Sequence, residues 1–116
     1  MMDSLQWLLV VVLLSLTLAA QADCVGQSCE NVSIEQLYVD AGQNGHNIWV
    51  RTSGNETALT GCIPNAGVYL WLDGSQPQKK EVYALLLTAF SMERAVTIRV
   101  VAGSQGCSIA YVYMNR

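Results

Sequence analysis

The segment from Ser75 to Ser91 is the only stretch after the N-terminus that has the pattern of an amphipathic helix. Ser75 stands three residues before Gln78, and Pro77 lies in what would be the first turn, which predicts a helix that starts with a capping box. At about 100° per residue, one face of this helix is apolar; it is formed by Val82, Leu86, Ala89 and Phe90. Because the segments on both sides read as strands, we expect a mostly β protein with one helix.

The N-terminus carries a largely apolar, uncharged run of fourteen residues, Trp7 to Ala20, followed by Gln21 and Ala22. The run is shorter than the roughly 18 to 20 residues of a membrane-spanning helix. A small residue on each side of Gln21 is typical of a cleavage site. We therefore expect a signal peptide over residues 1–22 and a secreted protein, extracellular or periplasmic. A retained anchor is the alternative, because no Lys or Arg precedes the run.

Residues 23–116 would remain after cleavage, and this length fits a single domain. They hold eight acidic and six basic residues, a net charge of about −2. No basic run exceeds the pair Lys79 and Lys80. Binding to nucleic acid or to an anionic membrane surface needs a larger basic patch. The sequence therefore predicts neither partner, and no membrane span in the mature chain.

Four cysteines follow the predicted cleavage site, and an even number in a secreted chain indicates two disulfides. Three pairings are possible. We favour Cys24 with Cys29, which closes a small local ring, and Cys62 with Cys107, which encloses the helix. A zinc site is the alternative, but it would call for paired Cys-x-x-Cys or cysteine/histidine spacing, and neither occurs in this sequence.

Five segments alternate apolar and polar residues as half-buried strands do. They are residues 32–40, 47–53, 68–72, 95–102 and 107–114, the last with Ile109, Tyr111 and Tyr113 expected on one face. With the helix, the order is β-β-β-α-β-β. This is the order of the OB-fold, a five-stranded barrel, so we expect an OB-fold-like barrel. A sheet with the helix packed on one face is the alternative.

The apolar helix and the strand after it, Val82 to Phe90 and Ala95 to Val100, resemble the B subunits of bacterial AB toxins, most of all the subtilase cytotoxin B-subunit type. Residues 34–39 resemble their first strand more faintly. The resemblance implies a secreted, disulfide-bonded OB-fold that assembles as a pentameric ring and binds glycans. Residues 91–94 depart from the usual turn after the helix. Residues 24–31 do not match the sugar-contacting residues of that subunit, so no site residue is carried over.

The sequence offers no set of residues for catalysis. A catalytic triad that uses histidine would have to include His46, the only histidine, which stands in a turn. No GxSxG, HExxH or glycine-rich phosphate loop occurs. We therefore expect neither an enzyme nor a cofactor.

The candidate ligand-binding residues are Trp49, Arg51, Tyr69 and Trp71. In alternating strands their side chains should point away from Ile48, Val50 and Leu70. Aromatic faces beside polar groups are suited to stacking on sugar rings. The alternative is that these aromatic side chains form the barrel core or a subunit interface.

The helix is apolar over too wide an arc for one sheet to cover. Leu85, Leu87 and Met92 flank the predicted core face and are the candidate oligomer interface. We therefore expect a homo-oligomer, with a pentamer as the specific prediction. The predicted function is non-enzymatic recognition of a cell-surface glycan, and the alternative is a secreted structural or inhibitory protein that binds another protein.

Overall fold

The computed structural model describes residues 22–42 and 47–116, and within them the chain is mostly β with one α-helix, as the sequence predicts. Most of the expected signal peptide, and His46, lie outside the described residues. The elements in order are β1 (Asp23–Val25), β2 (Ser28–Val32), β3 (Ile34–Asp40), β4 (Asn47–Thr52), η1 (Glu56–Ala58), β5 (Ile63–Pro64), β6 (Leu70–Asp73), α2 (Lys79–Met92), β7 (Val96–Val100), β8 (Gln105–Gly106) and β9 (Ile109–Tyr113).

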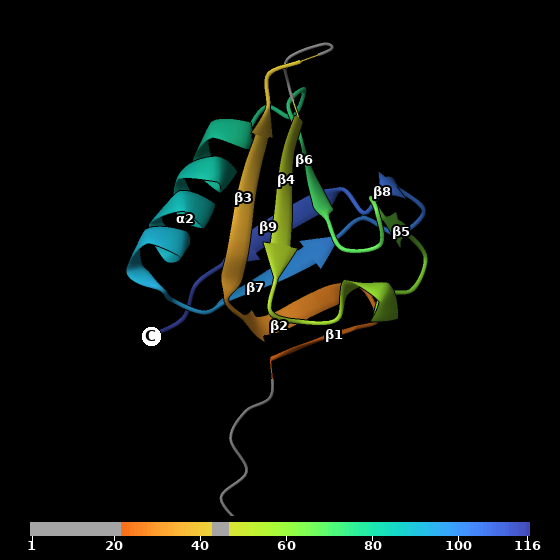
Figure 1. Ribbon diagram of the computed structural model, residues 1–116, viewed down its shortest axis with the longest axis horizontal. Helices are drawn as coiled ribbons and strands as arrows, with labels where there is room; N and C mark the ends of the chain where they lie inside the picture. The colour runs from red at the N-terminus through yellow and green to blue at the C-terminus, as the bar shows by residue number, and fades with distance from the viewer. Residues whose placement is uncertain (1–21, 43–46) are drawn as a thin grey trace, which may run out of the picture.

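The strands form two main sheets, β1-β2-β7-β9 and β3-β4-β6, whose directions cross (Figure 1). All neighbours in these two sheets are antiparallel. A third, parallel pair joins β5 to β8. At the seam between β6 and β9, the amide of Trp71 donates to the carbonyl of Cys107 at 3.1 Å. This bond links the two main sheets at one edge. In the described residues, however, the strand ladders do not close the sheets into a barrel.

The five predicted strands correspond to β3, β4, β6, β7 and β9, and the sequence analysis missed the others. The first predicted strand extends too far at its N-terminal end, because Val32 belongs to β2, the second strand of an N-terminal hairpin. β2 pairs with β7 before the chain passes Ser33 and enters β3. One continuous segment therefore contributes to both main sheets.

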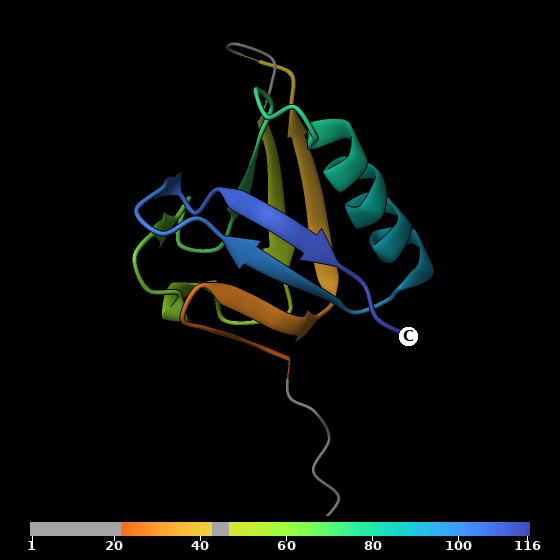
Figure 2. The same ribbon diagram turned by 180° about the vertical axis from the view of Figure 1, so that it is seen from behind.

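Helix α2 packs against β3, β6 and β9. It lies beside β3 in Figure 1 and to the right of β7 and β9 in Figure 2. Its fully buried residues are Leu86 and Ala89. The placement of Phe90 on the core face was wrong, since its side chain is 41% exposed. Phe90 points about 70° away from the direction midway between Leu86 and Ala89. Within residues 22–42 and 47–116, no helix has the length and hydropathy needed to cross a membrane.

The helix begins three residues later than predicted, since its N-cap is Gln78 in place of Ser75. Ser75 is used elsewhere, because its hydroxyl donates to Asp73 Oδ1 at 2.8 Å and its amide to the same oxygen at 2.9 Å. Gln78 is the residue before the helix and makes no side-chain capping bond. At the other end, Glu93 is left-handed, with φ 53°, and the amide of Arg94 donates to the carbonyl of Ala89.

Strand β9 is displaced by a bulge that the sequence pattern does not reveal. Its register with β7 shifts so that Val100 faces Ile109 while Arg99 faces Tyr111, which leaves Ala110 as the extra residue. Ile109 is therefore buried, whereas Tyr111 and Tyr113 are exposed and stacked on each other. The expectation that all three share one face was wrong.

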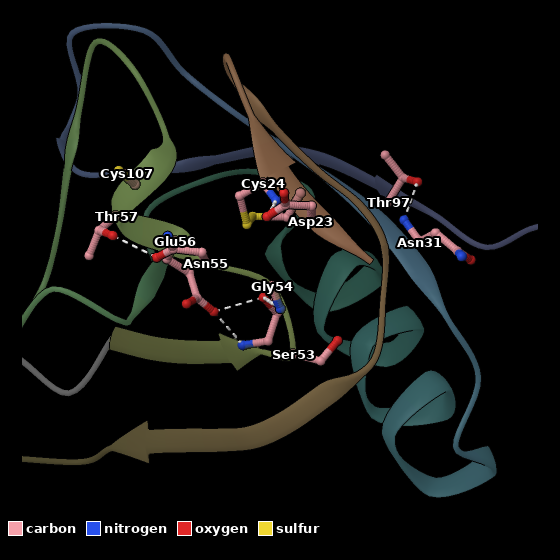
Figure 3. The surroundings of a disulfide bond; sticks show 12 residues. Asp23, Cys24, Asn31, Ser53, Gly54, Asn55, Glu56, Thr57, Thr97 and Cys107 are labelled. Atoms are coloured by element: carbon pink, nitrogen blue, oxygen red, sulfur yellow. Dashed lines mark hydrogen bonds between the residues drawn. A yellow bond between two sulfur atoms is a disulfide. The ribbon is translucent and has the colours of Figure 1, made fainter. Parts of the chain in front are cut away.

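Both disulfides that the sequence favours are present, Cys24 with Cys29 and Cys62 with Cys107. The first lies beside the loop that follows β4, where Gly54 approaches Cys24 (Figure 3). The loop is also held by Glu56, whose buried carboxylate accepts hydrogen bonds from the amide and the hydroxyl of Thr52, each at 2.7 Å. The N-terminal hairpin and this loop therefore form one packed unit.

Candidate functional site

The outward side of the β3-β4-β6 sheet carries a row of aromatic side chains. The strand register aligns Tyr38 on β3 with Trp49 on β4, and Trp49 with Trp71 on β6. Tyr69, just before β6, continues the same side of that strand. Alternation turns Val50, Leu70 and Leu72 inward, where they are buried. We call Tyr38, Trp49, Tyr69 and Trp71 the aromatic face.

The four rings form two contacting pairs. Trp49 and Trp71 are stacked, with ring centroids 6.1 Å apart and planes at 26°. Tyr38 and Tyr69 are tilted at 51°, with centroids 6.3 Å apart. All four side chains retain solvent exposure, and Tyr38 is 47% exposed. The aromatic face is therefore not part of the buried core, which was one of the two alternatives for these side chains.

Two hydrogen bonds fix the orientation of these rings. The indole nitrogen of Trp71 donates to Asn47 Oδ1 at 2.9 Å. The hydroxyl of Tyr69 donates to Gln36 Oε1 at 3.0 Å. The first bond joins the neighbouring strands β6 and β4, and the second reaches across β4 to β3. Both aromatic side chains are therefore held by polar groups of the same surface.

Arg51 lies on this side of the sheet but away from the tryptophan pair. It stands opposite Gln36 in the register, and its Nε is 3.8 Å from Glu35 Oε2. Both side chains of this ion pair are 49% exposed. Solvent screening makes such a pair weak, but the acidic partner reduces the positive field that Arg51 presents to a ligand.

A shallow cavity of about 410 Å³ borders the tryptophan pair. Its other walls come from Asn47 and from the β5-β8 region, above all Pro64, Asn65, Gln105 and Gly106. Gly106 has φ 70°, and a Cβ built on it would lie 3.8 Å from both Trp49 and Trp71. Because Cys62 and Cys107 flank β5 and β8, their disulfide holds this wall in place.

The structure brings three of the four predicted ligand-binding residues together and leaves Arg51 at the margin. Sequence reasoning missed Tyr38, although its alternation with Leu37 and Val39 gives the required signal. It also missed the amide-bearing walls of the cavity. Asn65 and Gln105 reach the site only through the pairing of β5 with β8, which no local pattern indicates.

The chemistry available at this site is stacking and hydrogen bonding. Aromatic rings beside carboxamide groups can contact the C–H face of a ring-shaped polar ligand and bond to its hydroxyls. In the part of the chain that the structure describes, no three His, Cys, Asp or Glu residues gather as a metal site would require.

The candidate interface residues on α2 differ in exposure. Leu87 is 42% and Met92 58% exposed, whereas Leu85 is partly buried. Phe90 adds to the apolar surface next to Leu87. The helix therefore presents uncovered apolar side chains on both sides of its buried stripe.

Comparisons of this chain with protein-family models, with curated proteins and with solved structures found no match.

Proposed function

We propose that this chain is a secreted, non-enzymatic recognition protein that binds carbohydrate through the aromatic face. The observation that carries the proposal is the row formed by Tyr38, Trp49 and Trp71 across three neighbouring strands. Partly exposed aromatic rings aligned in this way offer an apolar surface edged by hydrogen-bonding groups. Sugar rings combine the same two properties, an apolar C–H face and a hydroxyl edge.

The proposed architecture is an OB-type barrel, similar to that of the toxin B subunits. Four antiparallel pairings support it: β2 with β7, β3 with β4, β4 with β6, and β7 with β9. A parallel bridge between Trp71 and Ser108 adds contact at the β6-β9 seam. OB-folds bind oligosaccharides on the face of their second and third strands. In this order those strands are β4 and β6, which carry Trp49 and Trp71.

A glycan array tests the proposal. The full chain is expressed in cells that export it, and the recovered protein is applied to a broad panel of glycans. Tyr38→Ala should reduce binding to any glycan that the wild type retains, because one stacking surface is lost. Its matched control is Tyr111→Ala, since Tyr111 on β9 is 46% exposed, close to the 47% of Tyr38, but lies on the other sheet.

The outcomes separate the function from the fold. Binding that is weakened by Tyr38→Ala and kept by Tyr111→Ala would support the aromatic face. Equal loss in both variants would contradict this site. Silence of the wild type across the whole panel would contradict carbohydrate binding and favour the second candidate function.

That second candidate is binding to another protein, and the exposed apolar side chains of α2 favour it. Leu87, Phe90 and Met92 remain uncovered in a single chain, and uncovered apolar surface marks protein interfaces. We propose separately that, in the carbohydrate-binding protein, these residues pack with Leu85 against further copies of this chain in a closed ring, as the pentamer prediction requires. A closed ring satisfies head-to-tail contacts without leaving a free end.

A further inference from the structure

We infer that the cavity beside Trp49 and Trp71 selects uncharged sugar residues and rejects acidic ones such as sialic acid, uronic acids or sulfated sugars. This inference rests on the proposed carbohydrate-binding function and specifies its ligand class. It comes from the kind of polar groups that line the cavity and from the charges placed around it.

The polar side chains of the cavity wall are carboxamides, those of Asn47, Asn65 and Gln105. A carboxamide places a donor and an acceptor side by side. Adjacent sugar hydroxyls, each of which can donate and accept, match this pair. Among the described residues, the cavity wall contains no charged side chain, so none of these side chains can neutralise an acidic ligand.

The orientation of Asn47 is set by its neighbour. The indole nitrogen of Trp71 can only donate, so the atom of Asn47 that it contacts at 2.9 Å must be the oxygen. The amide nitrogen of Asn47 is therefore left to donate to a ligand. A sugar hydroxyl can accept this bond while its ring lies against the indoles.

The charges around the cavity are unfavourable to an acidic ligand. Asn47 stands opposite Asp40 on β3 and opposite Asp73 on β6. Arg51, a cation on the same side of the sheet, is four residues along β4, about 13 Å away, and already faces Glu35. An anion in the cavity would lie near two carboxylates, and no described residue of the cavity wall carries a compensating positive charge.

The array described above can be read for this inference when it includes matched pairs of glycans, such as lactose with 3′-sialyllactose and with 3′-sulfolactose. We expect the retained glycans to end in neutral sugars, and acidic capping of the same glycan to weaken binding at least tenfold. Affinity for the neutral member should be nearly unchanged between about 50 mM and 500 mM NaCl, because no ion pair is formed to be screened.

Two substitutions of Gln105 sharpen the test. Gln105→Leu removes one donor and acceptor from the cavity wall and should weaken the neutral glycan about tenfold. The same change at Gln78, an exposed residue before α2, is the matched control. Gln105→Lys places a cation at the cavity and should raise the ratio of acidic to neutral binding at least tenfold.

Each outcome has a defined meaning. The inference would be supported if the protein binds the neutral glycans, if Gln105→Leu weakens this binding and if Gln105→Lys raises the ratio of acidic to neutral binding. Preferential binding of the acidic member of each pair would overturn it and leave carbohydrate recognition standing. Absence of binding to either member in every pair would overturn both the inference and the proposed function.

Discussion

Gly54 approaches Cys24 so closely that a Cβ built on the glycine would lie 2.9 Å from the Cys24 sulfur. The same Cβ would lie 3.0 Å from a methyl group of Val32. Both neighbours are fully buried, so neither can move aside easily. The small disulfide ring therefore packs against bare backbone of the loop after β4.

Gly54→Ala should destabilise the fold by about 1 to 3 kcal/mol, the usual cost of forcing an extra carbon into a filled site. Urea unfolding measures this change. Gly42→Ala is the control, because among the described residues its Cβ would come within 3 Å only of the end of the half-buried Asp40 side chain. Equal effects of the two substitutions would contradict the packing described for Gly54.

Removal of the Cys62–Cys107 disulfide, by changing both residues to Ala, should cost about 4 kcal/mol. Loop-closure entropy gives this value for a sequence separation of 45 residues. The same estimate for Cys24 and Cys29, five residues apart, is about 2 kcal/mol. Denaturant unfolding of the two double variants tests the order. A larger loss from the Cys24–Cys29 pair would show that local packing outweighs loop closure.

Glu93→Gly should stabilise the protein by about 0.5 to 1 kcal/mol. Glu93 ends helix α2 with φ 53°, a left-handed conformation that costs less for glycine than for other residues. Thermal unfolding should show a higher midpoint. Ser91→Gly, two residues earlier and inside the helix, should lower it by a similar amount, and a fall for both variants would contradict the role assigned to Glu93.

Leu87→Glu and Met92→Glu should each reduce the assembled mass of the protein without unfolding it. Both side chains are exposed in the single chain, so a charge there disturbs contacts between copies and not the core. Light scattering at micromolar concentration gives the mass, and circular dichroism checks the fold. Thr88→Glu, on the outward side of the same helix, is the control. A wild-type protein of strictly monomeric mass would rule out the oligomer.

The strands that could be predicted from the sequence are those in which apolar and polar residues alternate, so that every second side chain is buried. β4 and β7 place Val50, Val96 and Ile98 inside and leave the residues between them more exposed, as their pattern predicts. The disulfides could also be predicted. Cys24 and Cys29 are close in sequence, and once they are paired, Cys62 and Cys107 can pair only with each other. In both cases the information is local or follows from counting.

The features that were missed depend on contacts between distant segments. β5 and β8 are two residues each and exist because Ile63 pairs with Gln105 and Pro64 with Gly106. Helix α2 starts later than predicted because the Ser75 hydroxyl donates to Asp73 and so does not cap the helix. The cavity beside the tryptophans is assembled from β4, β6 and this small parallel pair. Sequence alternation could therefore locate the aromatic side chains but not the walls around them.

In the proposed carbohydrate site, the Cys62–Cys107 bond makes the cavity wall depend on the redox state of the surroundings. The two cysteines flank the short strands that carry Ile63, Pro64, Gln105 and Gly106, all on the cavity wall. In a reducing compartment these strands would be joined only by their few backbone bonds, while the main sheets keep their own ladders. The proposed binding would then require oxidation of Cys62 and Cys107, and we expect a folded but reduced chain to bind the proposed ligand more weakly.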